Sequence, residues 1–191
     1  HSLAFSASFA KAMPSVQAKA RCPDAIFLPG DMAKYRRESA RIRAVFTSVS
    51  SDVEPLSLDE AFIDVTASVR LLGPPLVIGR LLKDRVRATT GLTVSVGIGP
   101  GKMVAKIASD VSKPDGLLEV PAGGVAAFLA PLPVGRLWGV GPVTERALHA
   151  AGFVTIGDLA RATEAALAPA VGRAAAALVL LARGTDVRTI E

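Results

Sequence analysis

The sequence lacks most features of secreted and membrane proteins. It has one cysteine, Cys22, so an intrachain disulfide is excluded and a reducing cytoplasm is the expected location. Cys22 precedes Pro23 in a loop-like stretch, where it can serve as a small apolar side chain or as a catalytic thiol. No apolar run reaches the length of a membrane span, because the run 174–182 is short and is bounded by Arg173 and Arg183. We therefore expect no membrane partner.

Other absences concern the beginning of the chain and its glycine-rich segment. Residues 1–5 contain neither an initiator methionine nor a basic region ahead of an apolar one, so they do not resemble a signal peptide. We expect the natural beginning of the chain to lie upstream of His1. The segment 97–102 is rich in glycine but lacks the Gly-Lys-Ser/Thr order of a phosphate loop. No long internal repeat or low-complexity tract is present.

Composition allows a substantial core and favours polyanionic partners. Half of the 191 residues are apolar, the formal net charge is +5 and the isoelectric point is near 9.8. The basic surplus lies at the N-terminal end, where residues 1–50 carry eight Lys and Arg against three Asp and Glu.

Periodicity divides the chain near residue 120. Before that point it predicts helices at 15–21, 31–46, 74–89 and 101–111, and strands at 25–28, 60–66, 93–99 and 117–120. The β–α–β–α–β order of the later elements indicates a sheet with packed helices, an α/β or α+β module. After Pro121 the pattern is entirely helical, with helices expected at 123–130, 142–151, 155–162, 163–168 and 171–183.

The most informative motif is Ser57-Leu58-Asp59-Glu60-Ala61-Phe62. Two adjacent acids precede a short alternating apolar run, and alternation directs neighbouring side chains to opposite faces of a strand. If both acids serve one site, the backbone must bend there or one acid must sit at the strand end. Paired carboxylates beside a buried strand need a compensating cation, and Mg²⁺ prefers a few carboxylates together with substrate phosphates.

Three lysines and two glycines follow this motif. The strand 93–99 carries Gly97 and Gly99 on one face, where another element must approach closely. Lys102 and Lys106 share a helix face at i, i+4 spacing, which fits a DNA contact or a solvated basic face. Lys113 precedes Pro114 in extended backbone and can point across the sheet at a phosphate.

A second motif is Gly139-Val140-Gly141, between two predicted helices. Such a turn exposes backbone N–H groups to an anion, and the helix that begins at Pro142 adds its N-terminal dipole. This is the pattern of a helix-hairpin-helix, which grips a DNA phosphate without reading bases. An ordinary corner between two helices is the alternative. The apolar spacing through Leu148, Phe153, Ile156 and Leu159 favours the helix-hairpin-helix.

Together these segments resemble a Y-family DNA polymerase of the DinB type, or DNA polymerase IV. The resemblance runs in order across nearly the whole chain, through these segments: Ala12-Met13-Pro14, Ala18–Pro23, Ser57–Phe62, Ser95–Gly99, Ala105–Asp110, Lys113–Gly116 and Gly139–Gly141. It implies an α+β fold with an incomplete palm sheet, packed helices and partial fingers. A small all-helical thumb with a helix-hairpin-helix follows. Residues 1–30 would be partial fingers, 31–120 palm, 121–186 thumb, and 187–191 the start of a linker to a little finger.

The resemblance also implies roles for single residues. Asp59 would bridge two Mg²⁺ ions, and Glu60 would hold the ion that activates the primer 3′-hydroxyl. Ser57 would position this pair, and Lys113 would contact the incoming triphosphate. DNA contacts would come from Lys102, Lys106, Gly139, Val140 and Gly141. The implied partners are primer–template DNA, a dNTP, and a sliding clamp reached through a C-terminal peptide beyond Glu191.

The resemblance further implies a third acid, on a first palm strand expected upstream of His1. Without that acid, the 191-residue chain is expected not to extend primers by itself. The sheet would also have an open edge, covered by a rearranged N-terminal segment near 2–9 or by another chain. Two other readings stay open: a non-catalytic polymerase-like accessory protein in DNA repair, and a helix-hairpin-helix module beside an unrelated α/β domain.

Overall fold

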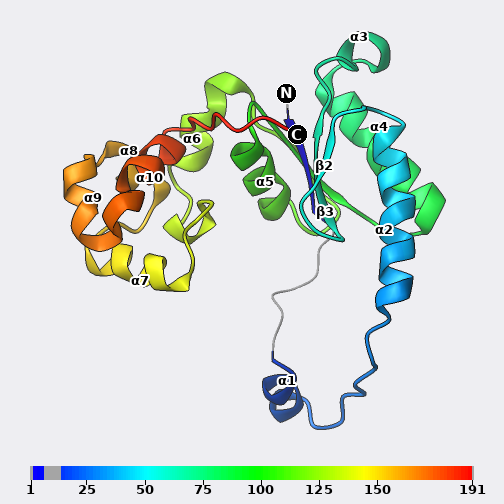
Figure 1. Cartoon of the computed structure of the whole chain (residues 1–191), viewed down its shortest axis with the longest axis horizontal. Coiled ribbons are helices and arrows are strands. Elements are labelled where there is room, and N and C mark those ends of the chain that lie inside the picture. The colour runs from blue at the N-terminus through cyan, green and yellow to red at the C-terminus, as the bar shows by residue number, and fades with distance from the viewer. Residues whose placement is uncertain (1, 7–13, 191) are drawn as a thin grey trace.

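A computed structural model describes residues 2–6 and 14–190 (Figure 1). Its centre is a five-stranded mixed sheet in the order β2-β3-β1-β4-β5. All neighbouring strands are antiparallel except β4 and β5, which are parallel. Proline is tolerated in β2 because that strand lies at the sheet edge. The strands are β1 (Ser2–Ser6), β2 (Val53–Pro55), β3 (Glu60–Asp64), β4 (Ser95–Gly99) and β5 (Leu117–Glu119).

Strand β1 corrects the expectation for the N-terminal region. The backbone of Ser2–Ser6 pairs with β3 on one side and with β4 on the other, so it lies in the middle of the sheet rather than with the fingers. The expected gap in the sheet therefore lies between β3 and β4 and not at an open edge. Without β1, both of these strands would lack a partner on that side. Residues 2–6 of the expected segment 2–9 fill this gap. Residues 7–9, like Ala12 and Met13 of the first motif, lie outside the described residues.

Helices cover both faces of the sheet (Figure 1). Helices α2 (Met32–Thr47) and α4 (Pro75–Thr90) pack on one face, and α5 (Lys102–Val111) packs on the other. Alternation along β3 divides its side chains accordingly, because Ile63 joins the α2–α4 core while Phe62 contacts Ala105 of α5. The short helix α3 (Val69–Leu72) links β3 to α4.

The predicted close approach at the strand glycines is confirmed. A Cβ atom on Gly97 would lie 2.0 Å from the carbonyl oxygen of Ala105, and one on Gly99 would lie 2.7 Å from the side chain of Val104. The backbone of α5 therefore lies directly on β4, which only residues without a side chain allow.

The described residues after β5 form helices and loops, apart from an isolated bridge between Pro133 and Thr155. Their core is continuous with one face of α5, since Met103 and Ile107 pack with Leu148, Ile156 and Leu159. The predicted apolar spacing of the helical part is thus confirmed. The elements are η1 (Ala122–Gly124), α6 (Val125–Leu129), η2 (Val134–Arg136), α7 (Pro142–Ala150), α8 (Ile156–Arg161), α9 (Glu164–Val171), η3 (Gly172–Ala174) and α10 (Ala175–Ala182).

Contrary to the expectation from the sequence, one stretch within the described residues, Glu164–Ala182, is long and apolar enough to cross a membrane by length and composition. It is divided into α9, η3 and α10, and Gly172 between them has a φ of 58°. Its buried residues belong to the helical core described above. We therefore interpret it as consecutive core helices.

Residues 14–31 differ from two expectations. Helix α1 (Ser15–Arg21) forms as predicted, but the strand expected at 25–28 does not, and Ile26 and Leu28 are exposed. An apolar run without a neighbouring strand has no ladder to join. Cys22 is exposed as well, so it does not serve as a buried apolar side chain.

Candidate functional site

The two adjacent acids lie at the point where a turn enters β3. The backbone N–H groups of Leu56 and Ser57 both donate to the carbonyl of Glu60, at 2.9 and 3.2 Å, so the chain bends just before the strand. Asp59 therefore belongs to the turn and is exposed, while Glu60 is the first strand residue and is half-buried. The Ser57 hydroxyl donates to Asp59 Oδ1 at 2.6 Å. This is the strand-end arrangement that a shared site for both acids requires, and it shows Ser57 orienting Asp59.

Lys102 and Lys106, both on α5, form ion pairs with acids on strands. Lys106 Nζ lies 2.8 Å from Glu60 Oε2, and Lys102 Nζ lies 2.5 Å from Glu54 Oε2 on β2. Lys102 is only 5% exposed, and its ammonium also lies 5.6 Å from the centre of the Phe62 ring. A cation that is buried and paired is not available to a DNA phosphate, so we withdraw Lys102 as a DNA contact.

Lys113 lies at the exit of α5, as the sequence suggested. Its ammonium is 2.7 Å from Asp110 Oδ1, three residues earlier in the chain. In this conformation the lysine is engaged with its own helix. Contact with a triphosphate remains a prediction, and it requires this partly exposed pair to open.

The acids can supply part of a magnesium site. Asp59 and Glu60 offer the carboxylate oxygens that Mg²⁺ prefers, and Lys106 already forms an ion pair with Glu60. Within residues 2–6 and 14–190, no group of three or more His, Cys, Asp or Glu is placed to hold a metal. The donor set therefore fits the ion chemically, with further oxygens to come from water or substrate.

The glycine turn has the geometry of a helix-hairpin-helix. Gly139 has a φ of 91°, a conformation that disfavours any residue with a side chain, and Gly141 precedes α7, which begins at Pro142. Val140 is different, because its side chain is buried and its N–H donates to the carbonyl of Leu137 at 3.0 Å. Its role is to anchor the turn in the core, so we no longer propose Val140 as a DNA contact.

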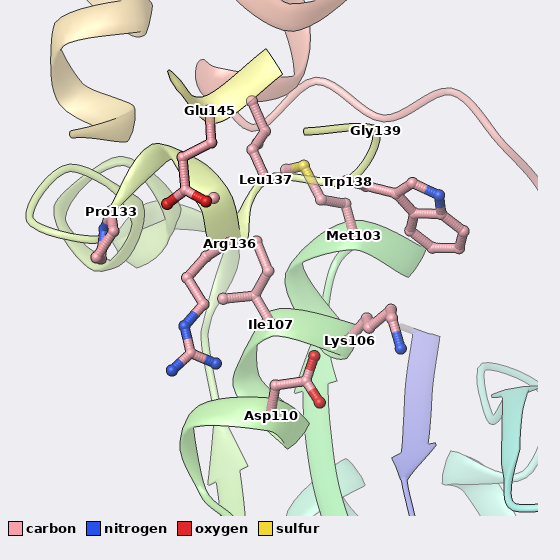
Figure 2. A pocket seen from close by; sticks show the side chains of 11 residues that line it. Met103, Lys106, Ile107, Asp110, Pro133, Arg136, Leu137, Trp138, Gly139 and Glu145 are labelled. Carbon is pink, nitrogen blue, oxygen red and sulfur yellow. The ribbon is translucent and has the colours of Figure 1, made fainter. Parts of the chain in front are cut away.

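A pocket of about 530 Å³ lies between α5 and this turn (Figure 2). Charged groups of both signs line it: Lys106 and Asp110 from α5, and Arg136 and Glu145 from the helical part. Gly139 of the glycine turn and the preceding Trp138 also line it. Lys106, which pairs with Glu60, and Gly139 of the glycine turn thus line the same pocket, although they are 33 positions apart in the sequence.

Sequence reasoning missed the residues that join the two halves of this region. Trp138 stacks on Phe62 with ring centroids 5.7 Å apart, and the Arg188 guanidinium lies 4.1 Å from the Trp138 ring centre. Arg188 also holds Asp186, whose carboxylate is buried. The chain's only tryptophan, directly before the glycine turn, was the one signal in the sequence that could have indicated this contact.

Three carboxyl groups outside the acid pair, Asp64, Asp158 and Asp186, have lowered pKa values, and the last two lie in the C-terminal half of the chain. Burial raises the pKa of Asp186, but hydrogen bonds from Arg188 and from the Met103 N–H outweigh it, and the net pKa lies below the ordinary value. Backbone and side-chain hydrogen bonds from Thr155, in the capping box of α8, lower the pKa of Asp158. Both groups are therefore charged at neutral pH and serve the fold.

Comparison with known proteins gives two family matches. The impB/mucB/samB family matches residues 3–110, and the IMS family HHH motif matches residues 123–153. The first match covers β2, β3, β4 and nearly all of β1 and α5, and the second covers the glycine turn.

Curated relatives agree with these matches. DNA polymerase IV of Desulfatibacillum aliphaticivorans is 44% identical over 180 residues, which are 94% of this chain and 46% of the relative. DNA polymerase IV of Stenotrophomonas maltophilia (strain K279a) is 47% identical over 180 residues, 94% of this chain and 50% of the relative. The chain thus spans about half the length of the curated relatives it matches.

Solved structures share the fold. DinB from Sulfolobus solfataricus matches with a TM-score of 0.86 and 31% identity, over 94% of this chain and 53% of that one. An insertion ternary complex of Dbh DNA polymerase matches with a TM-score of 0.85 and 31% identity over the same shares. The chain therefore belongs to the impB/mucB/samB family, as a DinB-type member of the Y-family DNA polymerases.

Proposed function

We propose that the chain is the palm and thumb region of a translesion DNA polymerase. The intact enzyme would transfer a nucleotide from a dNTP to a primer 3′-hydroxyl on a DNA template, with Mg²⁺. The observation that carries the proposal is the Asp59–Glu60 pair at the entry of β3, oriented by Ser57 and held by Lys106. The similarity to polymerases over 94% of the chain supports it.

Each residue of this site is proposed to have its own role. Asp59 and Glu60 would hold metal ions, which when bound stabilise the attacking and leaving oxygens of the transfer. Lys106 donates to Glu60 Oε2 and so restrains that side chain on the strand, and the Ser57 hydroxyl donates to Asp59 Oδ1. Lys113 would reach the triphosphate after leaving Asp110. A cytoplasmic location and a role in DNA repair belong to the same proposal.

Gly139 and Gly141 are proposed to present backbone N–H groups to a DNA phosphate. Gly139→Ala is expected to weaken duplex DNA binding about tenfold, because a displaced turn loses a hydrogen bond to a charged group worth roughly 1.4 kcal/mol. The measurement is fluorescence anisotropy with a labelled duplex, repeated over a salt series.

Gly152→Ala is the matched control. Gly152 also has a positive φ, of 85°, and a Cβ there would also meet nothing within 4 Å, so the backbone strain is similar. Because it lies at the other end of α7, its substitution should change affinity by less than about twofold. Equal effects of the two substitutions, or a parent affinity that does not fall with salt, would contradict the thumb assignment.

We also propose that the 191-residue polypeptide does not extend primers by itself. The resemblance implies a third carboxylate, and the described residues bring no such group to Asp59 and Glu60. A labelled primer on a template, with dNTPs and Mg²⁺ or Mn²⁺, should remain at its starting length. Extension above a no-protein control would refute this.

The main alternative is a non-catalytic polymerase-like protein that binds DNA during repair. Its advantage is that it needs no third carboxylate. Its weakness is that Asp59, Glu60 and Lys113 are all present. An accessory protein would bind DNA in the salt series but show no Mn²⁺ binding that depends on Asp59. A bare helix-hairpin-helix module is disfavoured because the family match extends over residues 3–110.

A further inference from the structure

The C-terminal segment returns from the helical half to the sheet half of the molecule. After α10 ends, residues 185–190 run past α6 to the sheet, as the red trace in Figure 1 shows. Thr185 is still tied to α10, since its N–H donates to the carbonyl of Leu180 at 3.0 Å. Ile190 packs at Phe62 and Ala105. We call residues 186–190 the strap.

Asp186 supplies a helix cap that the local sequence cannot supply. The N-cap residue of α5 is Gly101, which has no side chain to accept a hydrogen bond. The N–H of Met103 instead donates to Asp186 Oδ2 at 2.9 Å, from a residue 83 positions away. A carboxylate at this end also faces the positive end of the helix dipole. Attachment of the strap therefore stabilises α5 itself.

Arg188 joins this cap to the glycine turn. Its Nε and Nη2 donate to the two oxygens of Asp186 at 2.7 and 2.8 Å, a bidentate pair. The guanidinium also lies over the ring of Trp138, with Cζ 4.1 Å from the ring centre. The Asp186 side chain is 2% exposed, so its charge needs this partner.

Trp138 in turn contacts β3, the strand that begins at the acid pair. Its ring stacks on Phe62 at 5.7 Å, with 23° between the ring planes. Phe62 and Glu60 are two residues apart on β3 and therefore point to the same face. Trp138 also immediately precedes Gly139. A continuous series of contacts thus runs from the glycine turn to the start of β3.

We propose that the strap, through Asp186, Arg188 and Trp138, locks the glycine turn at a fixed position relative to the Asp59–Glu60 strand. These three are positioning residues. The lock itself does not depend on the proposed function; only its effect on DNA binding rests on the proposal that the turn grips DNA.

Trp138 is the only tryptophan, so its fluorescence reports on the lock directly. Arg188→Ala should shift the emission to longer wavelength and increase quenching by acrylamide, because the indole loses its cover. Hydrogen exchange followed by mass spectrometry should show faster exchange in peptides covering 137–145, with α4 unchanged. Arg188→Lys keeps the charge but not the planar fork, and should fall between the parent and Arg188→Ala.

Arg173→Ala is the matched control, since it removes an exposed arginine from the same helical part without touching the strap. It should leave both readouts as in the parent. All variants are first confirmed as folded by circular dichroism, and Arg188→Lys keeps the test decisive if Arg188→Ala does not fold. Unchanged fluorescence and exchange in both Arg188 variants would overturn the lock.

A DNA-binding measurement on the same variants tests the lock and the proposed function separately. Relative to Arg173→Ala, Arg188→Ala should weaken duplex binding about fivefold, or roughly 1 kcal/mol, the size of a partly desolvated cation–π contact. Altered fluorescence with unaltered relative affinity would overturn the positioning role. A parent that binds no DNA would refute the proposed function, while fluorescence and exchange would still decide whether the lock exists.

Discussion

Gly97→Ala is expected to destabilise the sheet half of the molecule by at least about 3 kcal/mol, enough to unfold a marginal domain. The added Cβ would lie 2.0 Å from the carbonyl oxygen of Ala105 and 2.2 Å from the backbone nitrogen of Ser109. Both atoms belong to the backbone of α5, which cannot rotate away as a side chain can. Because α5 also contributes to the helical core, both halves should be affected. Urea unfolding followed by circular dichroism measures the loss.

Two further Gly→Ala substitutions make this a graded series. At Gly123 a Cβ meets nothing within 4 Å, so the free energy of unfolding should change by less than about 0.5 kcal/mol. At Gly79 the nearest atom, at 2.8 Å, is Cδ1 of Leu117, a flexible side-chain end, so an intermediate loss is expected. If Gly97→Ala unfolded at the same urea concentration as Gly123→Ala, α5 would not lie on β4 as described.

Features that depend on neighbouring residues were predictable from the sequence. The glycines of β4 indicated a close approach, and α5 provides it. The adjacent acids before an alternating run required a bend or a strand end, and the turn at Glu60 satisfies that requirement. The helix predicted from residue 31 forms as α2, and it is capped locally, because the Asp31 side chain accepts from the Lys34 N–H at 2.9 Å. In each case the cause acts within a few residues, where periodicity and turn chemistry are informative.

Features that depend on distant pairing were not predictable in the same way. Periodicity could identify 60–66 as a strand but not the central place of Ser2–Ser6, which depends on pairing with β3 and β4. Lys102 and Lys106 were correctly placed on one helix, yet their partners lie 48 and 46 residues away, on β2 and β3. The link from Asp186 to Met103 spans 83 residues. Such contacts are set by the assembled sheet and carry no local signature.

Asp59→Ala is expected to reduce Mn²⁺ binding by at least about tenfold, or ~1.4 kcal/mol, and so below detection for a weak two-carboxylate site. Mn²⁺ replaces Mg²⁺ as the probe because free and bound Mn²⁺ can be distinguished by electron paramagnetic resonance. Asp59 is exposed and lies in a turn, so the fold should be unchanged. Asp84→Ala is the matched control, since it removes an exposed carboxylate from α4 that does not belong to the acid pair.

Lys106→Met should have the opposite effect. The Lys106 ammonium lies 2.8 Å from Glu60 Oε2 and competes with a metal ion for that carboxylate. Both side chains are partly exposed, so water screens much of the Coulomb energy. Mn²⁺ affinity should therefore rise by about fivefold, or roughly 1 kcal/mol. Methionine preserves most of the apolar length of the side chain and so limits the change in packing.

The two substitutions together decide which role the acids have. A loss in Asp59→Ala with a gain in Lys106→Met places the ion at both carboxylates, because only a shared site responds to each change. Weaker binding in Lys106→Met would mean that the lysine holds Glu60 in its ligating position rather than competing for it. Equal binding in Asp59→Ala, Asp84→Ala and the parent would remove the acid pair as a metal site. The turn before β3 would then serve only to begin the strand.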